Sequence, residues 1–235
     1  MTNAKDIHMI LGIIGTVISS LISLAPMPRF IEIYKKKSVE DGYQPQRHIA
    51  MIMKCTLWII YGLPLVHKDN ILVTITNGIS LGIEVIYLVI YYMYCDHKAW
   101  RDNIRVSLLY WISFVQYFAA VTHFLPRDGG RQIFIGGFST ALTIIIHAVF
   151  AFVKTLEVED KQIFQCMPLG LSFVSFINAA IWTAYSLIYQ IDIYVLVCNG
   201  LGTLACASQI IVNVYYLLYT PTVNAIEPVN VDIDE

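Results

Sequence analysis

The sequence predicts an all-α membrane protein with seven transmembrane helices, built as two parallel three-helix repeats joined by a linker helix. Three observations support this fold: the composition, the number of long apolar stretches, and a short sequence motif that occurs twice. Hydrophobic residues make up 57% of the 235 residues and charged residues 14%, against about 45–50% and about 25% in soluble domains. The net charge of −2 offers no basic surface for nucleic acid, so we expect no nucleic-acid partner.

Seven stretches have the roughly 20 apolar residues that a membrane-spanning helix needs. They cover about residues 8–28, 46–66, 70–95, 103–125, 131–153, 163–190 and 192–219. Residues 1–7 contain one lysine and no small-residue cleavage site, which predicts that the first helix is retained and not removed as a signal peptide. The last stretch is followed by residues 220–235, for which we expect a disordered acidic tail.

The basic residues predict the orientation, because Lys and Arg are retained on the cytosolic side of a membrane. Seven spans place the two termini on opposite sides. Four basic residues fall on the side of the N-terminus and ten on the other, so we expect the N-terminus outside and the C-terminus in the cytosol. The four are Lys5, Lys68, Arg127 and Arg131; the ten are Arg29, Lys35, Lys36, Lys37, Arg47, Lys98, Arg101, Arg105, Lys154 and Lys161.

A Trp-x-x-Tyr motif followed by Asn-Gly occurs twice, which indicates an internal repeat. The copies are Trp58, Tyr61, Asn77 and Gly78, and then Trp182, Tyr185, Asn199 and Gly200. They lie 124 positions apart at the tryptophans and 122 at the asparagines. They also lie four spans apart, so the two halves have the same orientation. The predicted units are residues 8–95, a linker helix at 103–125, residues 131–219 and the tail at 220–235.

The paired tryptophans and asparagines lie at one depth. At about 1.5 Å per helical residue, all four are roughly 10–12 Å from the outer ends of their spans. An amide inside a membrane needs a partner, and Asn-Gly pairs often serve helix–helix packing. A substrate site is the alternative, because indole faces stack on sugar C–H groups while amides bind hydroxyls. Two related pairs at one level favour the substrate site.

These residues resemble the SWEET sugar transporters of plants. The resemblance is carried by the stretch 54–64 (KCTLWIIYGLP), both Asn-Gly pairs, residues 35–40 (KKKSVE) and Met167-Pro168, and it extends over about residues 8–219. It implies the parallel 3+1+3 architecture known from these transporters. It also implies a facilitative sugar uniporter that works by alternating access, as a homo-oligomer, with no cofactor. We expect the plasma membrane, with the tonoplast as an alternative.

The resemblance also implies residue roles. Asn77 and Asn199 match the paired sugar-binding asparagines, and the other pocket positions are Trp58, Trp182, Lys54 and Asn178. The bulk of Trp58, Trp182 and Lys54 favours a hexose over sucrose. Tyr61 and Asp192 resemble the extracellular gate pair; without the resemblance they would be an interfacial anchor and a solvated loop charge. The hinge prolines are Pro26, Pro45 and Pro168.

The chain departs from the family pattern at two places. Lys54 stands where the family has a small polar residue. A lysine inside a membrane needs a partner or water, so Lys54 either pairs with Glu84 at a similar depth, enters the sugar cavity, or extends to the membrane surface. The hinge pattern is also incomplete. Pro45 lies two residues before its expected place, at Arg47, and the stretch 131–153 has no proline.

The residues are also compatible with other functions. A proton-coupled amino-acid exporter of the PQ-loop kind has the same 3+1+3 plan, and in that case Glu84 would titrate. A transport-impaired relative of the SWEET proteins is a further alternative, because of the departures above. A seven-span receptor would have no parallel repeat. The sequence contains no HExxH, G-x-S-x-G or phosphate-loop motif and no histidines at metal-ligand spacing, so we expect neither an enzyme nor a metal site.

Overall fold

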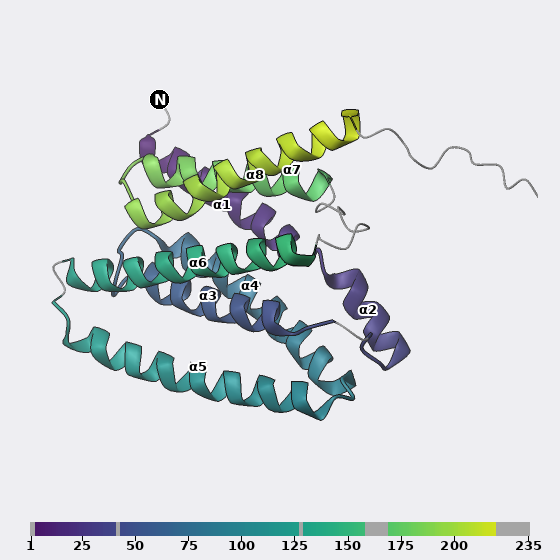
Figure 1. Cartoon of the computed structure of the whole chain (residues 1–235). Helices are drawn as coiled ribbons and strands as arrows, with labels where there is room; N and C mark the ends of the chain where they lie inside the picture. The colour runs from purple at the N-terminus through teal and green to yellow at the C-terminus, as the bar shows by residue number, and fades with distance from the viewer. Residues whose placement is uncertain (1–2, 41–42, 127–128, 158–168, 220–235) are drawn as a thin grey trace, which may run out of the picture.

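The computed structural model describes residues 3–40, 43–126, 129–157 and 169–219, and every regular element in these ranges is an α-helix (Figure 1). The helices are α1 (Ala4–Ser23), α2 (Met27–Lys36), α3 (Gln46–Gly62), α4 (Ile71–Tyr94), α5 (Lys98–Phe124), α6 (Gly130–Glu157), α7 (Leu169–Leu187) and α8 (Ile193–Tyr219). Within the described ranges, six segments are long and apolar enough to cross a membrane, and α1 and α2 together form the first. With α3, which has 17 residues, this confirms the predicted seven-span, all-α membrane fold.

The helix boundaries differ from the predicted ones where polar or proline residues intervene. The first crossing continues beyond residue 28, because α2 resumes at Met27 after a turn at Leu24–Pro26 and runs to Lys36. The second ends at Gly62 and not at 66, because Leu63 precedes Pro64 and is extended (φ −67°, ψ 143°). Helix α5 begins at Lys98, five residues before the predicted stretch, since its first turn is polar. Hydropathy does not detect such turns.

The helices pack in the same order in both halves. Helix α4 contacts α1, α2 and α3, and α8 contacts α6 and α7. Between the halves, α1 packs against α7 and α3 against α6. Helix α5 lies at the periphery of the bundle, beside α3 and α6 (Figure 1). The two interfaces between the halves, α1–α7 and α3–α6, are therefore related by the repeat.

Two glycines let these interfaces close. A Cβ atom at Gly12 of α1 would lie 2.8 Å from Tyr185 Cε2, and one at Gly136 of α6 would lie 2.8 Å from Tyr61 Cε2. Both tyrosine side chains are fully buried. Gly12 and Gly136 differ by 124 positions, as do Tyr61 and Tyr185. The repeat therefore extends beyond the repeated Trp-x-x-Tyr and Asn-Gly motif to the packing of the first helix of each half.

Candidate functional site

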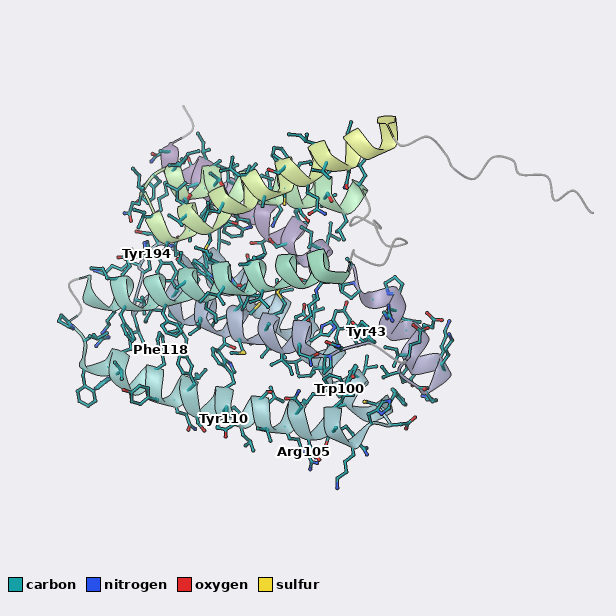
Figure 2. All side chains as sticks on the ribbon, in the orientation of Figure 1. Tyr43, Trp100, Arg105, Tyr110, Phe118 and Tyr194 are labelled. Atoms are coloured by element: carbon teal, nitrogen blue, oxygen red, sulfur yellow. The ribbon has the colours of Figure 1, made fainter. Side chains whose placement is uncertain are left out.

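The predicted gate residues meet at the end of the bundle where α3 ends and α8 begins, which we call the gate end. The Tyr61 hydroxyl donates to Asp192 Oδ1 at 2.7 Å, and the two side chains are 0% and 2% exposed. Figure 2 shows Tyr194, which follows closely on Asp192, and Tyr43 toward opposite ends of the bundle. This bond joins the end of α3 in the first half to the start of α8 in the second.

Asp192 also begins helix α8. Its Oδ1 accepts from the backbone N–H groups of Tyr194 and Val195, at 3.1 Å each. A carboxylate at this position satisfies helix N–H groups that have no partner within the helix. The alternative interpretation of Asp192 as a solvated loop charge is therefore wrong, since the carboxylate is buried and fully engaged.

Two residues for which no role was predicted, Asn70 and Tyr185, extend the hydrogen-bond network at the gate end. Asn70 Nδ2 donates to Asp192 Oδ2, and the Tyr185 hydroxyl donates to Asn70 Oδ1 at 3.1 Å. Each tyrosine thus bonds the polar residue of the opposite half. Asn70 and Asp192 are 122 positions apart, the same offset as Asn77 and Asn199. That offset was the signal by which Asn70 could have been found.

The predicted tryptophans bond across the two interfaces. Trp58 Nε1 donates to Thr143 Oγ1 of α6 at 2.9 Å, and Trp182 Nε1 donates to Ser19 Oγ of α1 at 3.1 Å. Thr143 and Ser19 again differ by 124 positions. The two indoles are buried, and these bonds fix the plane of each ring between the halves.

The predicted asparagines are held alike in the two halves. Asn77 Nδ2 donates to the Val73 carbonyl at 2.8 Å, and Asn199 Nδ2 donates to the Val195 carbonyl at 2.9 Å. A carbonyl oxygen can only accept, so the amide nitrogens must face these carbonyls. The amide oxygens are therefore left as acceptors, on side chains that are half-buried. Two such oxygens can accept hydrogen bonds from ligand hydroxyls.

The remaining predicted pocket positions, Lys54 and Asn178, differ in chemistry. Asn178 Oδ1 accepts from Ser19 Oγ at 3.0 Å, so on the α1–α7 side the amide, hydroxyl and indole form one neutral network. Lys54 is half-buried in α3, close enough to act electrostatically on His147 of α6 and Cys198 of α8. The lysine therefore places a positive charge on the α3–α6 side.

Lys54 does not pair with Glu84, which corrects one of the three alternatives considered for it. Glu84 Oε2 lies 2.6 Å from His48 Nδ1, and His48 Nε2 lies 2.7 Å from the Tyr43 hydroxyl. Burial raises the pKa of Tyr43 above its ordinary value, so the hydroxyl is a neutral donor. His48 can then donate to Glu84 from Nδ1 and accept from Tyr43 at Nε2, which satisfies all three groups.

Comparisons with known proteins agree with this geometry. Residues 9–99 match the family described as "Sugar efflux transporter for intercellular exchange". The chain is 43% identical to the bidirectional sugar transporter SWEET8 of Arabidopsis thaliana, over 99% of this chain and 98% of that relative. It is 35% identical to SWEET4 of the same plant, over 94% and 87% of the two chains. The chain belongs to the SWEET family.

A solved SWEET structure has the same fold. A eukaryotic SWEET transporter superposes with a TM-score of 0.83 at 25% identity, over 92% of this chain and 99% of that one. The relatives named above are transporters, not enzymes. Within the part of the chain that is described, no group of three or more His, Cys, Asp or Glu side chains could hold a metal ion.

The three prolines assigned to SWEET-type hinges lie in different settings. Pro26 is in the turn that separates α1 from α2. Pro45 is the residue before α3, so it begins that helix and does not interrupt it. Pro168 lies outside the described residues. Helix α6 runs without a break from Gly130 to Glu157, as expected of a stretch without proline. The hinge roles stay predictions.

Proposed function

We propose that this chain is a facilitative, bidirectional sugar uniporter that works by alternating access. One observation carries the proposal: Asn77 and Asn199 present their amide oxygens from equivalent positions, each held by a bond to its own helix. Hydroxyl groups of a sugar suit paired acceptors of this kind, and the neighbouring indoles of Trp58 and Trp182 suit its C–H faces. Relatives that match nearly the whole chain are named bidirectional sugar transporters, which supports the same function.

The hydrogen-bond network at the gate end supplies the moving part of the proposed cycle. The network joins Tyr61, Asp192, Asn70 and Tyr185, so opening this end requires that bonds between the halves break. We infer that the network is the extracellular gate, that the N-terminus is outside, and that the protein acts as a homo-oligomer in the plasma membrane. A hexose is the proposed substrate, because the bulk of Trp58, Trp182 and Lys54 favours a monosaccharide over a disaccharide.

Counterflow in proteoliposomes tests the function. Labelled glucose, fructose and sucrose are exchanged against unlabelled sugar, and we expect glucose to exchange fastest. Asn77→Ala and Asn199→Ala should each slow exchange by about tenfold or more, because each removes a polar partner of the bound hydroxyls. Asn103→Ala, on the exposed side of α5, is the matched control and should exchange normally. Normal exchange by both site variants would refute the proposed site.

A proton gradient distinguishes the uniporter from a proton-coupled exporter. A uniporter exchanges glucose equally well with and without a protonophore. The structure pairs Glu84 with His48 on the side of α4 that faces α3. Uptake that requires a pH gradient and is lost in Glu84→Gln would therefore overturn the uniporter and make this pair a coupling site.

A further inference from the structure

Lys54 is the position at which the two sides of the substrate site differ in charge. The equivalent residue, Asn178, satisfies its amide oxygen with the Ser19 hydroxyl. On the α3–α6 side the hydroxyl equivalent to Ser19 belongs to Thr143, which donates to the Ser139 carbonyl at 2.7 Å and accepts from Trp58. Thr143 therefore has no hydrogen left for a ligand, and the cationic group on this side is the Lys54 ammonium.

No counter-charge for Lys54 exists in the described part of the chain. Its two buried carboxylates are Glu84 and Asp192. Glu84 is engaged by His48, and Asp192 by the donors of the gate end. Neither lies within ion-pair distance of Lys54, and the groups on which Lys54 acts across the interface are an imidazole and a thiol. An unpaired ammonium inside a membrane protein is costly and marks a pathway for a ligand or ion.

We propose that the substrate supplies the missing negative charge, so that the preferred substrate is a monosaccharide carrying one carboxylate, such as a hexuronate. The hydroxyls bond the amide oxygens of Asn77 and Asn199, and the carboxylate pairs with Lys54. This inference rests on the proposed sugar transport. One ammonium matches a single charge, whereas a phosphate monoester carries nearly two at neutral pH. A neutral sugar leaves the ammonium without a partner, which disfavours it against the acid.

The test compares glucuronate, glucose and glucose 6-phosphate in counterflow with the full-length protein. We expect glucuronate to exchange and to compete with glucose at concentrations at least about tenfold below those at which unlabelled glucose does, as for a hydrogen bond to a charged group. Lys54→Asn, which copies the Asn178 side, should reverse this preference, and Lys54→Arg should keep it. Lys98→Asn, an exposed lysine of α5, is the matched control and should keep the preference.

Binding provides a second measurement that does not depend on transport. Quenching of tryptophan fluorescence by glucuronate in purified protein should be saturable, and should weaken by about tenfold or more in Lys54→Asn. Glucose exchange without glucuronate exchange or binding would overturn this inference and leave the proposed function intact. A preference for glucose 6-phosphate would also overturn it. Absence of all exchange would instead refute the proposed function, while saturable glucuronate binding lost in Lys54→Asn would still support the acid site.

Discussion

The α1–α7 and α3–α6 interfaces have the same packing and different polar chemistry. In both, a glycine of the first helix of one half lies against a buried tyrosine of the other: Gly12 against Tyr185, and Gly136 against Tyr61. In both, an indole donates to a hydroxyl of the opposite half. The glycine backbone lies so close to the tyrosine ring that an added Cβ atom would clash with it, which explains why both interfaces have glycine at this position.

The polar positions between these contacts have diverged. The α1–α7 side joins Ser19 and Asn178 in a neutral bond, whereas the α3–α6 side carries Lys54 and His147. The gate end shows the same pattern, since Asn70 and Asp192 occupy equivalent places and only one is charged. The packing residues are therefore shared by the two halves. The polar residues differ between them, and we expect the specific properties of this chain to depend on those polar residues.

The largest effect is expected at Asp192, the charged member of the hydrogen-bond network at the gate end. Asp192 accepts at both oxygens, from Tyr61, from two backbone N–H groups and from Asn70. In Asp192→Asn, either orientation of the amide turns its NH₂ group toward one of these donors. We expect a loss of about 3 kcal/mol in the free energy of unfolding, as for hydrogen bonds to a charged group, measured by thermal and denaturant unfolding in detergent.

An exchange of the two residues sharpens the comparison. In the double variant Asn70→Asp, Asp192→Asn, the carboxylate at position 70 accepts from Tyr185 and from the amide at position 192. That amide can still accept from Tyr61 and begin α8, because Asn is also a good N-cap residue. The double variant should therefore recover at least half of the lost stability. A double variant no more stable than Asp192→Asn would show that positions 70 and 192 of the network are not equivalent.

The next effect is expected from an added methyl group at the packing positions. A Cβ at Gly136 would lie 2.6 Å from Tyr194 and 2.8 Å from Tyr61, and the buried Tyr61 ring cannot turn aside without losing its bond to Asp192. We expect Gly136→Ala to cost about 2 kcal/mol of stability and to slow exchange. Gly12→Ala should cost less, because its nearest obstacle is the flexible end of Leu72.

The neighbouring glycine is the control for that experiment. A Cβ at Gly137 meets no atom within 4 Å, so Gly137→Ala should leave stability unchanged or raise it by up to about 1 kcal/mol, as alanine favours a helix over glycine. If Gly136→Ala and Gly137→Ala were equally stable, the close contact of Gly136 with the tyrosine rings would not limit the residue size at this position of the α3–α6 interface.

Much of the fold followed from the sequence because it depends on local patterns. Apolar stretches of sufficient length predicted the membrane-spanning helices, and the spacing of the repeated motif predicted which helices of the two halves are equivalent. Boundaries at polar turns were less accurate, as at the start of α5, because hydropathy does not detect a helical turn of charged residues. The turn at Pro26 separates α1 from α2, and the apolar count ended near this turn because α2 is rich in charged residues.

The sequence predicted neither the depth nor the helix face of the partner of Glu84. Lys54 and Glu84 were expected at similar depths, but the residue that meets Glu84 is His48. His48 and Lys54 are six positions apart on α3, which places them about 9 Å apart along the helix axis and on different faces of the helix. Only the packing of α3 on α4 decides which face meets the carboxylate. By contrast, Asn70 could have been found by applying the repeat offset to Asp192.

The smallest effect is expected when the hydroxyl acceptor of each indole is removed in turn. Ser19→Ala removes the acceptor of Trp182 Nε1 and the donor to Asn178, whereas Thr143→Val removes only the acceptor of Trp58 Nε1 among contacts between the halves. We expect a loss of about 1.5 kcal/mol for Ser19→Ala and less than about 1 kcal/mol for Thr143→Val, since each net hydrogen bond contributes about 0.5–1.5 kcal/mol. Unfolding midpoints measured side by side in one detergent provide the comparison. Equal losses would mean that the Ser19–Asn178 bond contributes nothing, and that the neutral side of the site is held by its indole alone.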